Sequence, residues 1–249
     1  MKYLPFLSEV HQRLRPERYL EIGIRNGDSL ALSTCRSVGI DPAFNLRAEL
    51  DTHVTLFRTT SDEYFSRPAP LSVTNGEPFD LTFIDGMHLF EFALRDFVNT
   101  ERSSRHNSVI VFDDVLPRSV DEAARKRHTS AWTGDVYPII DVLARYRPEV
   151  ATILVDTEPT GLLLVVGLDP SSTVLSDNYD QIMKEYRHAD PQPVPQALLD
   201  RVAVQAPNRV LDAQFWKVIA EERLNPSIDD FNPRLRRQLA ADFGPRYAP

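Results

Sequence analysis

Acidic residues stand directly after two strongly apolar stretches near the middle of the chain. The stretch "FDLTFIDG" contains Asp85, and "SVIVFDD" ends at Asp113 and Asp114. If these stretches are neighbouring parallel strands, they lie about 4.8 Å apart and their carboxyl ends bring the three carboxylates together. Unpaired carboxylates would raise one another's pKa. A hard divalent cation such as Mg²⁺, which prefers oxygen ligands, relieves this repulsion.

A histidine stands three residues after the first of these acids, in the sequence "DGMH". An imidazole titrates near neutral pH, so His88 could take part in chemistry beside the carboxylates. Two plainer readings stay open. His88 could simply begin the following helix, and Asp114 could cap a helix that starts near Pro117.

The elements that position these residues alternate between strand and helix. An amphipathic helix over 4–14 precedes the first strand, and an antiparallel hairpin closes the series. The alternation predicts an α/β fold with a doubly wound, mostly parallel, Rossmann-like sheet. Strands are expected over 18–24, 37–42, 53–60, 79–86, 108–114 and the hairpin 151–168, and further helices from about residue 28, over 88–102 and over 136–146.

Glycines and acids also mark the ends of the first two expected strands. The stretch "EIGIRNG" contains Glu21, Gly23 and Gly27. Glycine lets a backbone approach a ligand closely, although both glycines could serve strand–helix packing alone. Asp41 ends the second strand, where an acid can accept ribose hydroxyls. The spacing is not the G-x-G-x-x-G dinucleotide fingerprint, which argues against a nicotinamide cofactor.

Together these features resemble the class I S-adenosylmethionine-dependent methyltransferases over roughly residues 15–170. The closing hairpin is similar to that family's sheet. The polar residues after the third strand stand where a purine would lie. The resemblance implies a class I methyltransferase fold whose S-adenosyl-L-methionine site contains Glu21, Gly23, Ile24, Gly27, Asp41, Ser61, Asp62 and Asp85.

The stretches "FIDGMHLFEFALRDF" and "VIVFDD" resemble the metal-dependent sugar O-methyltransferases typified by macrocin O-methyltransferase. This resemblance implies that Asp85, Asp113 and Asp114 bind Mg²⁺ and that Asp85 and His88 are catalytic. A second branch of that family places an acidic base two residues after the first ligand, where this chain has Met87. The implied acceptor is a small hydroxylated molecule, a sugar or glycosylated metabolite, whose neighbouring hydroxyls the metal would chelate.

The segment 117–138, "PRSVDEAARKRHTSAWTGDVYP", carries one tryptophan among several cations. It could stack on a sugar ring and hold an anionic group, or it could be a solvated helix with a buried Trp132. We expect Asp135 to cap the helix that follows. Glu91 and Asp96 are placed on the polar side of the helix 88–102. Glu91 could orient His88 from i+3, or it could be solvated or paired with Arg95 at i+4.

The overall composition limits the partners. The formal net charge of −8 argues against nucleic acid, and no apolar run is long enough for a membrane span. The single cysteine, Cys35, fits a cytoplasmic location. We expect a methyltransferase domain over 1–170 and a helical, proline-rich extension over 171–249, through which a homo-oligomer could form. Two alternatives remain: a cofactor-binding scaffold without transfer activity, and an NAD-dependent oxidoreductase.

Overall fold

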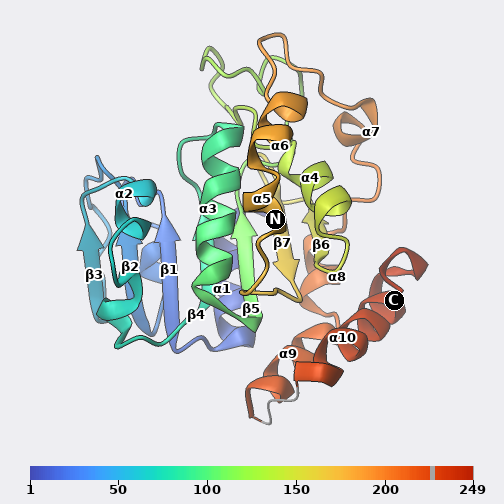
Figure 1. The fold of residues 1–249 in the computed structure, drawn as a ribbon. Helices are drawn as coiled ribbons and strands as arrows, with labels where there is room; N and C mark the ends of the chain where they lie inside the picture. Colours follow the sequence, from blue (N-terminus) through green and yellow to red (C-terminus); the bar gives the residue numbers. More distant parts are fainter. Residues whose placement is uncertain (225–227, 249) are drawn as a thin grey trace.

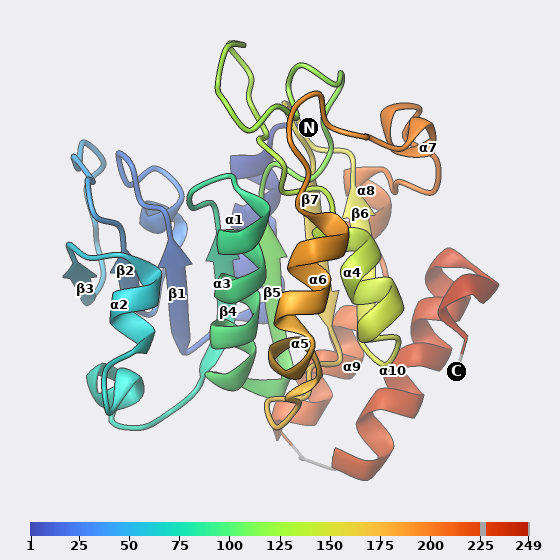
Figure 2. The same ribbon diagram turned by 45° about the horizontal axis from the view of Figure 1, so that its top comes forward.

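The computed structural model describes residues 1–224 and 228–248, which form one seven-stranded sheet between two layers of helices (Figures 1 and 2). The order of the strands is β3-β2-β1-β4-β5-β7-β6. The first five strands are parallel, and β7 runs antiparallel to both β5 and β6. The expected fold is therefore confirmed. The strands are β1 (Arg18–Ile22), β2 (Arg36–Ile40), β3 (Val54–Phe57), β4 (Phe79–Ile84), β5 (Ser104–Phe112), β6 (Ala151–Val155) and β7 (Leu162–Val166).

The central strands are apolar on both faces because both faces are covered. In β7, Leu163 and Val165 belong to one core, whereas Leu162, Leu164 and Val166 belong to the other. Successive side chains of a strand point to opposite faces, so a continuous apolar run fills two cores at once.

One helical layer packs on each face (Figure 2). The first core is closed by α2 (Ser61–Phe65), α3 (Phe90–Arg102), α4 (Ile139–Tyr146), α5 (Val174–Asp177) and α6 (Tyr179–Tyr186). The second is closed by α1 (Tyr3–Leu14), α8 (Pro207–Leu211), α9 (Phe215–Leu224) and α10 (Ile228–Phe243). The remaining short elements are α7 (Gln196–Leu199) and the 3-10 turns η1 (Leu30–Leu32), η2 (Pro70–Thr74) and η3 (Pro245–Tyr247).

The prediction of a helix from about Asp28 is wrong, because the chain forms only the short 3-10 turn η1 there. The Ser29 hydroxyl donates to buried Glu21 (2.7 Å) instead of capping a helix. Ser33 takes an extended conformation (ψ 136°) and its hydroxyl accepts from the Cys35 N–H. Serine and cysteine are weak helix formers, and a serine side chain competes for backbone partners.

The C-terminal extension packs on its own chain. Phe215 and Ile219 of α9, with Leu235 and Leu239 of α10, are buried in the second core beside α1 and the strands β5–β7. These helices therefore complete the helical layer on that face (Figure 1). The division into two domains near residue 170 stays a prediction. Among the described residues, no helix combines the length and the apolar character that crossing a membrane requires.

Candidate active site

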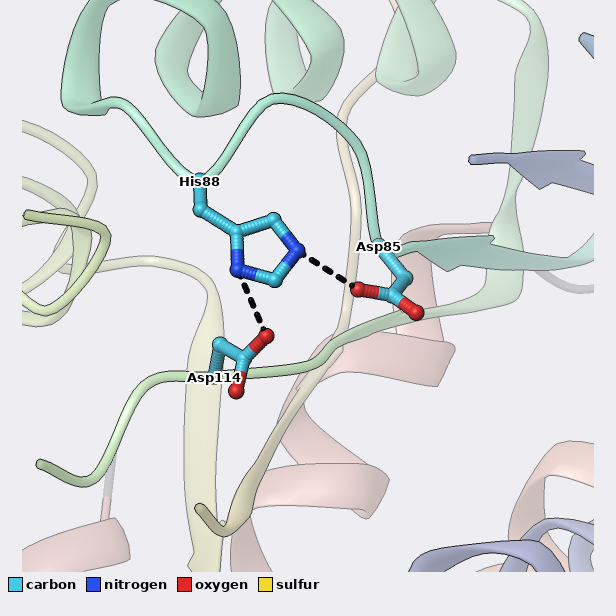
Figure 3. Close-up of side chains that lie close together, drawn as sticks. All are labelled: Asp85, His88 and Asp114. Carbon is cyan, nitrogen blue, oxygen red and sulfur yellow. Dashed lines mark ion pairs between the residues drawn. The ribbon is translucent and has the colours of Figure 1, made fainter. Parts of the chain in front are cut away.

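The acidic cluster forms where β4 and β5 end side by side. Ile84 of β4 pairs with Phe112 of β5, so the chain leaves both strands at the same edge of the sheet. Asp85 follows β4, Asp114 lies just beyond β5, and His88 lies in the turn that leads into α3. Figure 3 shows the imidazole ring of His88 between the two carboxylates.

His88 makes an ion pair with each neighbouring acid. Its Nε2 lies 3.0 Å from an oxygen of Asp85, and its Nδ1 lies 2.8 Å from an oxygen of Asp114. The Nδ1 also lies 3.2 Å from the carbonyl oxygen of Trp132. With both carboxylates ionised, all three partners are hydrogen-bond acceptors, so both ring nitrogens donate and the ring is an imidazolium.

Electrostatics agree with this geometry. Burial disfavours the charged form of His88, but the hydrogen bonds to Asp114 and Asp85 outweigh burial and raise its pKa to about 11. Burial also raises the pKa of Asp85. The imidazolium therefore supplies a positive charge between two acids, and in this state His88 cannot accept a proton.

The backbone at this site is strained at two residues. His88 has a φ of +54° and Asp114 a φ of +61°, which are uncommon values for residues other than glycine. Such conformations persist where the surrounding structure holds them, and they gather at functional sites. The helix expected to begin at residue 88 begins at Phe90 instead, because His88 leaves the helical region.

Asp113 is placed differently from its neighbour. Its carboxylate accepts the backbone N–H of Asp114 at 2.8 Å, and the residue is 7% exposed. Burial and the charges of Asp114 and Asp85 raise its pKa well above its usual value. Its role as a metal ligand stays a prediction. It does line a small cavity of about 10 Å³, roughly the room for one water, together with Ile84, Asp85, Gly86, Met87, His88, Ala93, Asp96, Phe112, Asp114 and Val136.

The cluster fits a divalent cation. One ligand atom each from Asp85, His88 and Asp114 lies within 4.8 Å of the others, so the three can converge on one ion. Two carboxylates suit Mg²⁺ or Mn²⁺, whereas an imidazole ligand favours Mn²⁺ or another transition metal. A cation held by His88 would require a ring nitrogen to release its proton.

The glycine after β1 allows that strand to meet the acidic cluster. Gly23 has a φ of +88°, and a Cβ there would lie 1.8 Å from the carbonyl oxygen of Asp85. Only glycine permits this contact between the ends of β1 and β4. The expected cofactor edge is therefore next to the expected metal site.

The acid after β2 is bound to the loop after β1. Asp41 accepts the backbone N–H groups of Ile24 and Arg25, each at 2.9 Å, and that of Ala43 at 2.6 Å. A Cβ on Gly27 would lie 2.8 Å from the Leu46 side chain, which covers this glycine. The acid and glycines suit S-adenosylmethionine chemically.

The polar residues expected near the purine are engaged inside the protein. Both carboxylate oxygens of Asp62 accept from the Arg95 guanidinium, at 2.8–3.1 Å. Ser61 favours the charged form of Asp96 and so opposes the rise of its pKa. Their contact with the cofactor therefore stays a prediction.

Asp96 is not on the polar side of α3 as expected, because it is 2% exposed and lines the small cavity. Burial raises its pKa to about 7. The helical spacing could have indicated that Asp96 is buried. It lies three residues after Ala93 and next to Phe97, and both of these are on the buried side of α3. Glu91 likewise pairs with Arg125 and Arg187 rather than with Arg95.

Tyr3 is a further residue of this edge that the sequence did not indicate. Its ring stacks on Phe83 of β4 with centroids 6.3 Å apart. Burial raises the pKa of its hydroxyl, and the nearby charges of Asp113 and Asp85 raise it further. The contact joins α1 to a strand about eighty residues away, so no local pattern could reveal it.

Glu21 is expected to make stability fall as the pH rises. It is fully buried, and burial raises its pKa to about 8 from 4.5, even though Tyr19 and Ser29 donate to it. Between these values the folded protein keeps a proton that the unfolded chain has released. The free energy of unfolding should therefore decrease by up to about 1.4 kcal/mol per pH unit.

Urea unfolding of the Glu21→Gln variant between pH 5 and 8 measures this contribution. The variant should show a smaller decrease than the parent, because Asp96 and His88 still bind protons more tightly in the folded state, while exposed Glu17→Gln should keep the dependence of the parent. Equal slopes in Glu21→Gln and the parent would show that Glu21 is ionised in the folded state.

The comparisons with known proteins agree with this fold. Residues 20–115 match the family model described as a methyltransferase domain. A Klebsiella pneumoniae protein provisionally described as an O-methyltransferase has 18% sequence identity and a TM-score of 0.50, covering 67% of this chain and 80% of its own. No curated protein matches.

Two further structures are similar at lower scores. A Bacillus cereus O-methyltransferase in complex with SAH shows 19% identity and a TM-score of 0.46, covering 66% of this chain and 80% of its own. TomG from Streptomyces achromogenes is an O-methyltransferase involved in tomaymycin synthesis, and its structure was solved in complex with SAM. It shows 22% sequence identity and a TM-score of 0.46, covering 66% of this chain and 79% of its own.

The matched segment runs from β1 to the residues just after β5. It includes the glycine loop, Asp41 and all members of the acidic cluster. The family match and the class I methyltransferase fold together support the expectation that this chain is a methyltransferase.

Proposed function

We propose that this protein is an O-methyltransferase that uses S-adenosylmethionine and a divalent cation, Mg²⁺ or Mn²⁺. The observation that carries the proposal is His88 held between Asp85 and Asp114 at the end of β4 and β5. Gly23 brings the cofactor edge against the backbone of the same Asp85. Methyl donor and acceptor can then meet at one edge of the sheet.

Each residue has a distinct role in the proposed reaction. When bound, the cation lowers the pKa of the acceptor's hydroxyls, and S-adenosylmethionine supplies an electrophilic methyl group. Asp85 and Asp114 hold the cation. His88, after giving up one of its two ring protons, accepts the proton of the hydroxyl that attacks the methyl carbon. The protein's main contribution is to orient these groups.

The acceptor is proposed to be a small molecule with neighbouring hydroxyls, a sugar or glycosylated metabolite. A groove of about 590 Å³ lies between α4, α6 and the residues around α7, with Tyr137, Tyr186, Pro193 and Leu198 among its walls. This size and apolar lining are typical of small-molecule sites. Val136 lines the acidic cavity and the next residue, Tyr137, lines the groove, which makes the groove a candidate site for the acceptor. The net charge of −8 and the single cysteine support a cytoplasmic enzyme that does not bind nucleic acid.

The experiment combines cofactor binding with methyl transfer. Titration calorimetry should show that S-adenosylhomocysteine binds and that NAD does not. Radiolabelled S-adenosylmethionine with a panel of glycosides bearing neighbouring hydroxyls should give labelled product with Mn²⁺ or Mg²⁺, and none with EDTA.

The outcomes separate the alternatives. Labelled product that persists in EDTA would show that no cation takes part. Cofactor binding without cation binding would favour the scaffold, and NAD binding in place of S-adenosylhomocysteine would favour the oxidoreductase.

A further inference from the structure

The turn that carries His88 is packed against a second segment of the chain, residues 122–135. The indole ring of Trp132 stacks on the His88 imidazole, with centroids 5.0 Å apart and planes within 4° of parallel. The Trp132 Nε1–H donates to the Ala124 carbonyl oxygen at 2.6 Å. The N–H of the indole is therefore bound by its own segment, and the face of the ring contacts His88.

The backbones of the two segments are also in close contact. A Cβ on Gly134, which has a φ of +56°, would lie 1.7 Å from the carbonyl oxygen of His88. Only glycine permits this approach. His88 is therefore held by its ring and by its backbone, which explains how its positive φ is maintained.

A single guanidinium fastens this segment to the start of α3. Arg125 donates to both carboxylate oxygens of Glu91, at 2.6 and 3.0 Å, and also to Asp135. Asp135 in turn accepts the backbone N–H of Phe90 at 3.1 Å. The expectation that Asp135 caps the following helix is thus wrong, since it binds the first residue of α3 instead.

Arg125 also balances charge. The Asp135 side chain is fully buried, and Glu91 is 15% exposed. Burial raises the pKa of Asp135, whereas the Phe90 N–H and the Arg125 guanidinium favour its charged form. Without Arg125, Glu91 would still pair with Arg187 at 3.2 Å, but buried Asp135 would keep only the Phe90 N–H, which is costly. The cations beside it in sequence, Lys126 and Arg127, are exposed.

We propose that Trp132 and Arg125 are positioning residues for His88. Trp132 sets the plane of the imidazole, so that its two nitrogens point at Asp85 and Asp114. Arg125 holds the segment that carries Trp132 against α3. The catalytic consequence rests on the proposed function, but the contact does not. Residues 122–135 therefore serve the metal site. His88 covers one face of the Trp132 indole, and stacking of the other face on a sugar stays a prediction.

The contact can be tested without metal or substrate. The chain has two tryptophans, so 5-fluorotryptophan labelling gives two ¹⁹F signals, and Trp132→Phe identifies that of Trp132. Arg125→Gln and His88→Gln should each shift the Trp132 signal. Lys126→Gln removes a charge from the neighbouring exposed residue and should leave it in place. A Trp132 signal unmoved in Arg125→Gln would overturn the proposal.

The effect on the site is measured as Mn²⁺ affinity by electron paramagnetic resonance. Loss of a residue from the shell around a metal site costs about 10–100-fold in metal affinity. We expect a loss in this range for Arg125→Gln and Trp132→Leu, a smaller loss for Trp132→Phe, and none for Lys126→Gln. Arg125→Lys keeps the positive charge but loses the planar guanidinium that binds both oxygens of Glu91, so its loss of Mn²⁺ affinity should be intermediate. This variant serves as the test if Arg125→Gln does not fold.

The two proposals fail in different ways. If the parent protein does not bind Mn²⁺, the proposed function fails, while the ¹⁹F result still decides whether Arg125 positions Trp132 on His88. If the parent binds Mn²⁺ and the variants bind it equally well, the residues only pack and the positioning role is wrong.

Discussion

Asp114→Asn should weaken Mn²⁺ binding by about 100-fold or more, whereas Asp113→Asn should weaken it by less than about fivefold. The Asp114 carboxylate faces His88 within the cluster that can converge on one cation. The Asp113 carboxylate instead accepts the N–H of Asp114, and an asparagine oxygen can accept the same bond. Because the surroundings raise the pKa of Asp113, its neutral form is the one that asparagine imitates.

Electron paramagnetic resonance of free Mn²⁺ gives both affinities directly. Asp121→Asn is the matched control, since its side chain is 79% exposed. Methyl transfer should follow the same order, with S-adenosylhomocysteine affinity nearly unchanged in all three variants. If Asp113→Asn loses as much Mn²⁺ affinity as Asp114→Asn, Asp113 is a metal ligand as well.

The second large effect is expected for His88→Gln, which should lower kcat by about 10²–10⁴-fold, the usual contribution of a general base. It should also change how cation binding depends on pH. The hydrogen bonds to Asp114 and Asp85 favour the doubly protonated ring of His88 and raise its pKa to about 11. A cation held by Asp85 and Asp114 beside this ring displaces one of its protons, so cation affinity should rise by up to about tenfold per pH unit between pH 6 and 9.

Calorimetry in two buffers of different ionisation enthalpy counts the protons released. About one proton per Mn²⁺ is expected for the parent and none for His88→Gln. His11→Gln is a useful comparison, because His11 is buried on α1 and belongs to no described metal-binding group. If the parent releases no proton, His88 keeps both of them beside the cation and cannot be the base.

The fold could be predicted because each central strand is apolar on both faces and ends in a recognisable turn. That pattern also placed Asp85 and Asp114 correctly at one edge of the sheet, since parallel neighbours end together. The sequence could not separate Asp113 from Asp114. The difference depends on the positive φ of Asp114, which turns one carboxylate toward His88 and leaves the other on the backbone.

Contacts between distant segments account for most of the remaining differences. Trp132 and Arg125 reach the turn at His88 from more than thirty residues away, and Tyr3 reaches β4 from the start of the chain. Neither periodicity nor spacing encodes such pairs. The wrong prediction of a helix near residue 28 has a local cause, because the Ser29 hydroxyl donates to buried Glu21 and does not cap a helix.

The most direct test of the metal site is a crystal of the full chain grown with S-adenosylhomocysteine and soaked in MnCl₂. Anomalous diffraction near the manganese edge locates the ion without assumptions about its ligands. The structure predicts one strong peak between Asp85 and Asp114, within bonding distance of a His88 nitrogen or of a water that His88 holds. A crystal with bound S-adenosylhomocysteine and no anomalous peak at these residues would contradict the cation-dependent mechanism.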